Sequence, residues 1–199
     1  MNKKNLTILL VALVTVTFAS CKRDESITIP DDIANGVTIN GIRWATRNVG
    51  TPGEFASAPE SMGNHFQWNR RTADWVQNWN GNNATEWERE NDPCPPGWRV
   101  PNETELRSLE SAIYRWVEVN GVYGRLFGAR PNLLFLPATG WRSQNNGVLD
   151  ASSVGMHGRY WSSVVPAEIN AMTLNFNPGG STVDSNSRAF GFSVRCVAD

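Results

Sequence analysis

A proline-rich stretch around one cysteine and one tryptophan, residues 91–101, constrains this chain more than any other segment. Four prolines and a glycine fall within it, and because proline fixes φ while glycine frees it, the backbone there is stiff and irregular. A helix is expected directly afterwards, since Asn102 suits an N-cap and Glu105 completes a capping box. Apolar residues then recur at helical spacing and predict one face packed on a core: Leu106, Leu109, Ile113, Trp116 and Val117.

Residues 1–20 read as a secretory signal peptide, because two lysines precede a short uncharged apolar run that ends in small residues. The run is short for a membrane span, and a retained anchor helix is the alternative. Residues 18–21 resemble a bacterial lipobox, which implies lipidation of Cys21 and a flexible tether over residues 21–36. Residues 22–25 resemble the signal that directs Bacteroidetes lipoproteins to the outer face of the outer membrane; a solvated linker is the alternative.

The remaining residues, 37–199, are expected to form one domain that does not bind nucleic acid. Residues 1–20 hold two lysines and no acid, so 18 − 2 = 16 basic residues stand against 19 acidic ones, a net charge of −3. Such a balance offers no positive field for phosphates. Once Cys21 is lipidated, Cys94 and Cys196 remain, and in an exported protein such a pair predicts a disulfide; two buried free thiols are the alternative.

Short strands separated by polar loops are predicted through the rest of the domain. Residues 37–39 and 42–44 flank Asn40-Gly41, a pattern typical of a hairpin. Residues 133–137 are an apolar run typical of a strand buried on both faces. Residues 172–177 alternate between apolar and polar, and a last strand carries Cys196. Together with the helix, these elements predict an α+β fold.

Four motifs, in order along residues 37–199, resemble the Fibrobacter succinogenes major paralogous domain (FISUMP), which is abundant in Bacteroidetes lipoproteins: residues 44–50, 92–101, 160–163 and 191–197. The resemblance implies a C-type lectin-like variant of the α+β class, with one or two helices and long loops, and it implies no particular activity. The usual sequence triplets of calcium-binding lectins are absent, so we expect no obligate calcium. We also expect no other metal and no cofactor.

The C-terminal segment also resembles that of bacterial proteins diversified by retroelements, in which a fixed scaffold carries substitutable surface positions. Polar residues alternating with apolar anchors suit that role, although ordinary strands with a solvated face give the same pattern. The positions are Asn145, Asn146, Asp150, Ser152, Ser153, His157, Asn170, Asn175, Asn177, Ser181, Asp184, Asn186 and Ser187.

These observations predict a surface-anchored, calcium-independent module that binds an extracellular protein or glycan through loops of residues 141–188. The candidate ligand-binding residues are Trp141, Arg142, Asn145, Asn146, Asp150, His157, Arg159, Asn170, Asn175, Asn177, Asp184, Asn186 and Arg188. A structural subunit of the cell surface or of a fimbria is the alternative. No enzyme is expected, because two histidines are few for a catalytic or metal site and no nucleophile motif occurs. Among nine tryptophans, Trp75, Trp79 and Trp87 are the best candidates for exposed rings, with core packing expected for most others.

Overall fold

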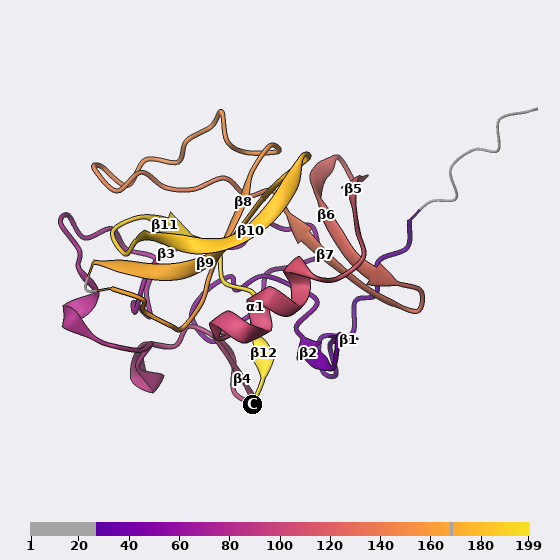
Figure 1. Ribbon diagram of the computed structural model, residues 1–199, viewed down its shortest axis with the longest axis horizontal. Helices are drawn as coiled ribbons and strands as arrows, with labels where there is room; N and C mark the ends of the chain where they lie inside the picture. Colours follow the sequence, from indigo (N-terminus) through magenta and orange to yellow (C-terminus); the bar gives the residue numbers. More distant parts are fainter. Residues whose placement is uncertain (1–26, 168) are drawn as a thin grey trace, which may run out of the picture.

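The computed structural model describes residues 27–167 and 169–199, and it consists mainly of short antiparallel strands (Figure 1). The predicted signal peptide and Cys21 lie outside the described residues. The strands are β1 (Val37–Ile39), β2 (Ile42–Trp44), β3 (Phe66–Gln67), β4 (Trp98–Arg99), β5 (Tyr114–Val119), β6 (Val122–Ala129), β7 (Asn132–Pro137), β8 (Gly158–Trp161), β9 (Asn170–Asn177), β10 (Gly180–Ser187), β11 (Gly191–Phe192) and β12 (Val197–Ala198). The helices are α1 (Glu103–Glu110) and the short 3₁₀ turns η1 (Gly81–Asn83) and η2 (Arg89–Asn91).

The strands form four small antiparallel sheets, in the orders β1-β2-β12-β4, β10-β9-β8, β11-β3 and β5-β6-β7. Pairing β12 with both β2 and β4 brings the end of the described chain beside its first hairpin. Figure 1 shows the long strands β9 and β10 above α1, with the β5-β6-β7 sheet to one side. In the described part of the chain, no helix has the length and apolarity that crossing a bilayer requires.

The expected α+β, C-type lectin-like class is wrong, because strands make up 37% and helices 8% of the described residues. The fold is mainly β. The capping box formed as predicted: the Asn102 side chain accepts from the Glu105 N–H, and the Glu105 carboxylate accepts from the Asn102 N–H. The helix nevertheless ends at Glu110, well before the expected apolar stripe does.

Residues 114–119 form strand β5 instead of the last turns of that helix. Asn120 and Gly121 both have positive φ and turn the chain directly into β6, as a type I′ hairpin requires. The β-branched and aromatic residues of this segment suit a pleated strand better than a helix. Ile113, which the helical pattern placed on the core face, is 76% exposed.

Other local predictions are confirmed. Asn40 and Gly41 have positive φ and join β1 to β2 with Ile39 opposite Ile42. Strand β7 is almost wholly buried. Strand β9 alternates only from Leu174 to Asn177, because Thr173, a polar position of the predicted pattern, is fully buried and its hydroxyl donates to the Asp184 carbonyl. Cys196 is an exception, since it lies just before the short strand β12 instead of within a continuous last strand.

Two large apolar clusters form the core. The first packs α1 and the β1–β2 hairpin against β7 and β9 through residues such as Leu109, Trp44, Leu134 and Leu174. The second is aromatic and surrounds the disulfide: Trp68, Trp87, Trp98, Trp161, Phe192, Cys94 and Cys196. Large rings therefore replace the aliphatic residues that the middle of the chain lacks.

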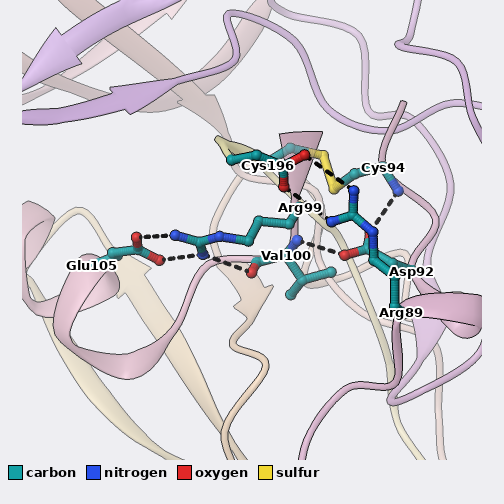
Figure 2. Close-up of polar contacts among 8 residues, drawn as sticks. Arg89, Asp92, Cys94, Arg99, Val100, Glu105 and Cys196 are labelled. Atoms are coloured by element: carbon teal, nitrogen blue, oxygen red, sulfur yellow. Dashed lines mark hydrogen bonds and ion pairs between the residues drawn. A yellow bond between two sulfur atoms is a disulfide. The ribbon is translucent and has the colours of Figure 1, made fainter. Parts of the chain in front are cut away.

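The predicted disulfide between Cys94 and Cys196 is present and buried (Figure 2). Asp92 holds the adjoining proline-rich segment, because its carboxylate accepts from the backbone N–H of Cys94 at 2.8 Å and of Val100 at 3.0 Å. Burial raises the pKa of Asp92, and these two hydrogen bonds oppose that effect. The irregular segment is thus fixed by one covalent and several polar links.

The tryptophans expected to be exposed are held in place. Trp87 is buried and its Nε1–H donates to the Asn91 carbonyl, while the Nε1–H of Trp79 donates to the Trp68 carbonyl. The Trp75 ring lies so close to Gly147 that a Cβ there would overlap it. These rings anchor the long segment between β3 and β4 to the body of the domain.

The described part of the predicted tether contacts the domain. Ile27 and Ile29 pack on a small cluster on the outer face of β5-β6-β7. Asp31 forms an ion pair with Arg47, which lowers the pKa of that carboxyl. Residues 27–31 therefore fix where the chain enters the domain.

Candidate binding groove on the outer face of β8, β9 and β10

The face of the β10-β9-β8 sheet that points away from α1 carries a row of polar side chains. Neighbouring residues of a strand point to opposite faces. Leu174 and Phe176 of β9 are buried in the cluster that includes α1, so Asn175 between them faces the other way. The strand register places Arg159 of β8 on one side of Asn175 and Thr182 of β10 on the other. Three strands thus contribute one residue each to this row.

The row opens into a groove of about 480 Å³ at the end of the sheet. Its lining residues are His157, Gly158, Arg159, Asn175, Phe176, Asn177, Gly179, Gly180, Ser181 and Thr182. They include amides, hydroxyls, an imidazole and one guanidinium, and no carboxylate. Further along the same face, Trp161 and Thr173 are fully buried, while Asp184, opposite Thr173 on the edge strand, is exposed.

Arg159 is held between two aromatic rings. Its guanidinium carbon lies 3.9 Å from the centre of the Trp141 ring and 5.5 Å from that of Phe192. Both distances are within the range of cation–π contact. Phe192 is itself fixed against Trp161, with ring centres 4.4 Å apart. These contacts hold the guanidinium at the wall of the groove.

The N–H groups of the Arg159 side chain have no partner among the described residues. The side chain donates no hydrogen bond to them and forms no ion pair with them. Burial lowers the pKa of Arg159, and the nearby Asp150 carboxylate opposes that effect. Asp150 is itself occupied, because its Oδ1 accepts from both the N–H and the hydroxyl of Ser152. An arginine side chain stays protonated at neutral pH, so the groove carries one positive charge.

The two asparagines of the groove have different local roles. The Asn175 amide donates to Thr173 Oγ1 at 3.1 Å, which orients it on the sheet. The Asn177 Oδ1 accepts from the backbone N–H groups of Gly179 and Gly180 and so forms the turn between β9 and β10. Asn177 therefore shapes the groove, while Asn175 lines it with an amide that also contacts the side chains of Thr173 and Asn186.

His157 closes the other end of the groove. Its ring meets Trp141 edge to face, with centres 5.7 Å apart, and its carbonyl accepts from the Gly140 N–H. Trp141 thus contacts both His157 and Arg159 and organises that wall. Of the residues predicted from sequence, Trp141, His157, Arg159, Asn175 and Asn177 come together here.

Two predicted arginine anchors belong to the scaffold instead. Arg142 donates to the carbonyls of Gly147 at 2.6 Å and Ala73 at 2.8 Å, which ties two loops together. Arg188 is 1% exposed, lies 4.5 Å from the Trp68 ring centre and donates to the Asn80 carbonyl at 3.1 Å. Neither guanidinium faces the groove.

The other predicted residues do not line the groove. Asn145 and Asn146 lie exposed in the turn between Ser143 and Val148. Asn186 borders the groove, because its amide donates to Thr173 Oγ1 at 2.7 Å and to Asn175 Oδ1 at 3.5 Å. Asp184 is exposed on the same edge strand, β10. Asn170 is at the far end of β9, where its carbonyl accepts from Arg188. The predicted binding loops of residues 141–188 are thus partly strands.

Thr182 and Phe192 were missed by sequence reasoning. Thr182 lies in a strand with a single buried apolar residue, Val183. The sequence therefore shows no apolar–polar alternation that would predict which face Thr182 occupies. Phe192 looks like an ordinary core residue, and only its distance to Arg159 reveals the second role. Among the residues that the structure describes, no three His, Cys, Asp or Glu side chains are grouped to hold a metal ion.

A family model described as a domain of unknown function (DUF8237) matches residues 129–197, a segment that contains every residue of the groove. No curated protein and no solved structure gives a significant match to the chain.

Proposed function

We propose that this chain is a lipid-anchored cell-surface module that binds a glycan, without calcium, in the groove on the outer face of β8, β9 and β10. The observation that carries the proposal is the row of Arg159, Asn175 and Thr182, supplied by three neighbouring strands at the open end of the sheet. A row built on paired strands is held more rigidly than one built on loops, which lowers the entropic cost of binding.

The chemistry of the lining favours a glycan over a protein partner. Sugar hydroxyls both donate and accept hydrogen bonds, and the amide of Asn175 and the hydroxyls of Ser181 and Thr182 do the same. The groove volume of about 480 Å³ lies within the range of small-ligand sites. Stable protein interfaces instead bury about 800 Å² on each partner around aromatic or aliphatic anchors.

Calcium independence is part of the proposal. Calcium takes oxygen ligands that normally include carboxylates, and the groove lining contains none. Ligand binding is therefore expected to persist in EDTA. A loss of binding in EDTA that added calcium restores would contradict this part of the proposal.

The test is a glycan array probed with the chain from residue 22 onward and with Asn175→Ala and Thr182→Ala variants. The matched control is Asn145→Ala, the same substitution in an exposed turn outside the groove. Thermal unfolding of each variant checks that the fold is intact. A ligand lost in the two groove variants and kept in the control supports the proposal. Binding that is indifferent to all three substitutions, or the absence of any bound glycan, overturns it.

The assembly state of the protein in solution distinguishes a binding module from the alternative, a structural surface subunit. A binding module of this size is expected to run as a monomer in size-exclusion chromatography with light scattering. Formation of regular filaments, together with an empty glycan array, would favour the structural role.

A further inference from the structure

Resting on the proposed function, we infer that the ligand carries a carboxylate, as an acidic sugar does, and that Arg159 recognises it. The glycan proposal needs only hydrogen-bonding groups in the groove. The placement of Arg159 adds the requirement that the ligand be negatively charged, and three observations support this requirement.

The first observation is that aromatic rings hold the guanidinium of Arg159 in place, while its N–H groups lack hydrogen-bond acceptors among the described residues. Trp141 and Phe192 hold it by cation–π contacts at 3.9 and 5.5 Å, yet it donates no side-chain hydrogen bond to any described residue. The two predicted arginine anchors outside the groove behave differently. Arg142 and Arg188 direct their N–H groups to main-chain carbonyls.

The second observation is that Arg159 lines the groove and is the only cation to do so among the described residues. The lining holds no carboxylate that would neutralise it, and the nearby Asp150 accepts hydrogen bonds from Ser152 instead. A positive charge in a partly desolvated groove, without a counter-charge in contact, favours an anionic ligand.

The third observation concerns geometry. A guanidinium presents parallel N–H groups in a planar fork that matches the two oxygens of a carboxylate. Arg159 lies within cation–π distance of two rings and donates no side-chain hydrogen bond to a described residue, so its fork is free to bind a carboxylate. The neighbouring Asn175 amide and Thr182 hydroxyl can bind the adjacent sugar hydroxyls. A hexuronic or sialic acid residue has this combination of one carboxylate and several hydroxyls.

The experiment compares acidic glycans with neutral partners of the same skeleton: hexuronic-acid oligosaccharides and their carboxyl-reduced forms, and sialylated glycans and their desialylated forms. The proteins are wild type, Arg159→Met and Arg159→Lys, with Arg115→Met as the matched control. Arg115 is exposed on β5, outside the groove, so its loss changes the net charge equally. Methionine retains an unbranched apolar stem between the rings, and unfolding midpoints check each fold.

We expect wild type to bind acidic glycans and to lose at least about tenfold in affinity on carboxyl reduction, in line with a charge-assisted hydrogen bond. Arg159→Met should show the same loss and Arg115→Met none. Arg159→Lys should show a smaller loss, because lysine keeps the positive charge but lacks the planar fork. Binding of neutral glycans that Arg159→Met leaves unchanged would overturn this inference and leave the proposed function standing. An array with no bound glycan would overturn both.

Discussion

The guanidinium carbon of Arg159 lies 3.9 Å from the centre of the Trp141 ring, and the same ring meets His157 edge to face. Trp141 comes from the segment between β7 and β8, whereas Arg159 is in β8 itself. An irregular segment thus positions the one charged side chain that a regular strand contributes to the groove. Trp141 is a positioning residue, because its ring contacts Arg159 and His157 and is not part of the groove lining.

We therefore expect Trp141→Leu to weaken ligand binding without removing any group that contacts the ligand. The loss should be about 0.5 to 2 kcal/mol, the usual strength of a cation–π contact. A double-mutant cycle tests the mechanism: in the Arg159→Met background, Trp141→Leu should have little further effect on affinity. Additive losses in the double variant would instead indicate that Trp141 acts independently of Arg159.

Gly158 at the base of the groove is expected to tolerate no side chain. A Cβ at this position would overlap the Phe176 ring, which is buried and stacked on Tyr160. Gly158→Ala should lower the free energy of unfolding by about 1 to 3 kcal/mol, the usual cost of overpacking. Gly180 supplies the control, because it lines the same groove and a Cβ there would meet nothing within 4 Å.

Urea unfolding of Gly158→Ala and Gly180→Ala measures this difference. Gly180→Ala should unfold within about 0.5 kcal/mol of wild type, as surface substitutions usually do. Equal stability of the two variants would mean that the packing of Phe176 against β8 adjusts more freely than the structure indicates.

Much of the local structure was predictable where a short sequence signal determines the backbone. The Asn40-Gly41 turn and the Asn102 cap depend on residues within four positions of each other, and both formed as expected. The helix was overextended because the apolar residues of 113–117 fit a helical period. The Asn120-Gly121 pair that follows gives the same hairpin signal as Asn40-Gly41 and favours strands on both sides.

The groove was only partly predictable, because which face a side chain occupies depends on pairing between distant strands. Asn175 and Arg159 were candidates from their residue types, but only the register of β8 with β9 places them side by side. Arg142 and Arg188 looked equally suitable. Sequence shows that an arginine is charged, and it does not show which main-chain carbonyls will accept its N–H groups.

The disulfide is expected to supply a large share of the stability. It joins residues 102 positions apart, and closing a loop of that length stabilises a fold by about 4 to 5 kcal/mol in the chain-entropy model. A Cys94→Ala, Cys196→Ala double variant should therefore unfold at a much lower urea concentration than oxidised wild type. Wild type unfolded and refolded in reductant is the control and should resemble the double variant. A difference below about 1 kcal/mol would contradict the prediction.

Acidification is expected to destabilise the fold through His65. This side chain is 7% exposed, and its Nε2 lies 3.2 Å from the Thr139 carbonyl. Burial lowers the pKa of His65 from 6.5 to about 4; the Thr139 carbonyl opposes this and the Arg142 charge adds to it. The unfolded chain therefore binds a proton at a higher pH than the folded chain does, so stability is fully present above pH 6.5 and declines as the pH falls toward 4.

Because one pKa unit corresponds to about 1.4 kcal/mol, the loss between pH 7 and pH 5 should be about 2 kcal/mol. Urea unfolding at several pH values measures it, and this window lies above the range in which most carboxylates titrate. The His65→Gln variant should be less stable than wild type at pH 7, because its packing is imperfect, yet its stability should change little between pH 7 and pH 5. An equal pH dependence in the variant would show that other groups cause the acid sensitivity.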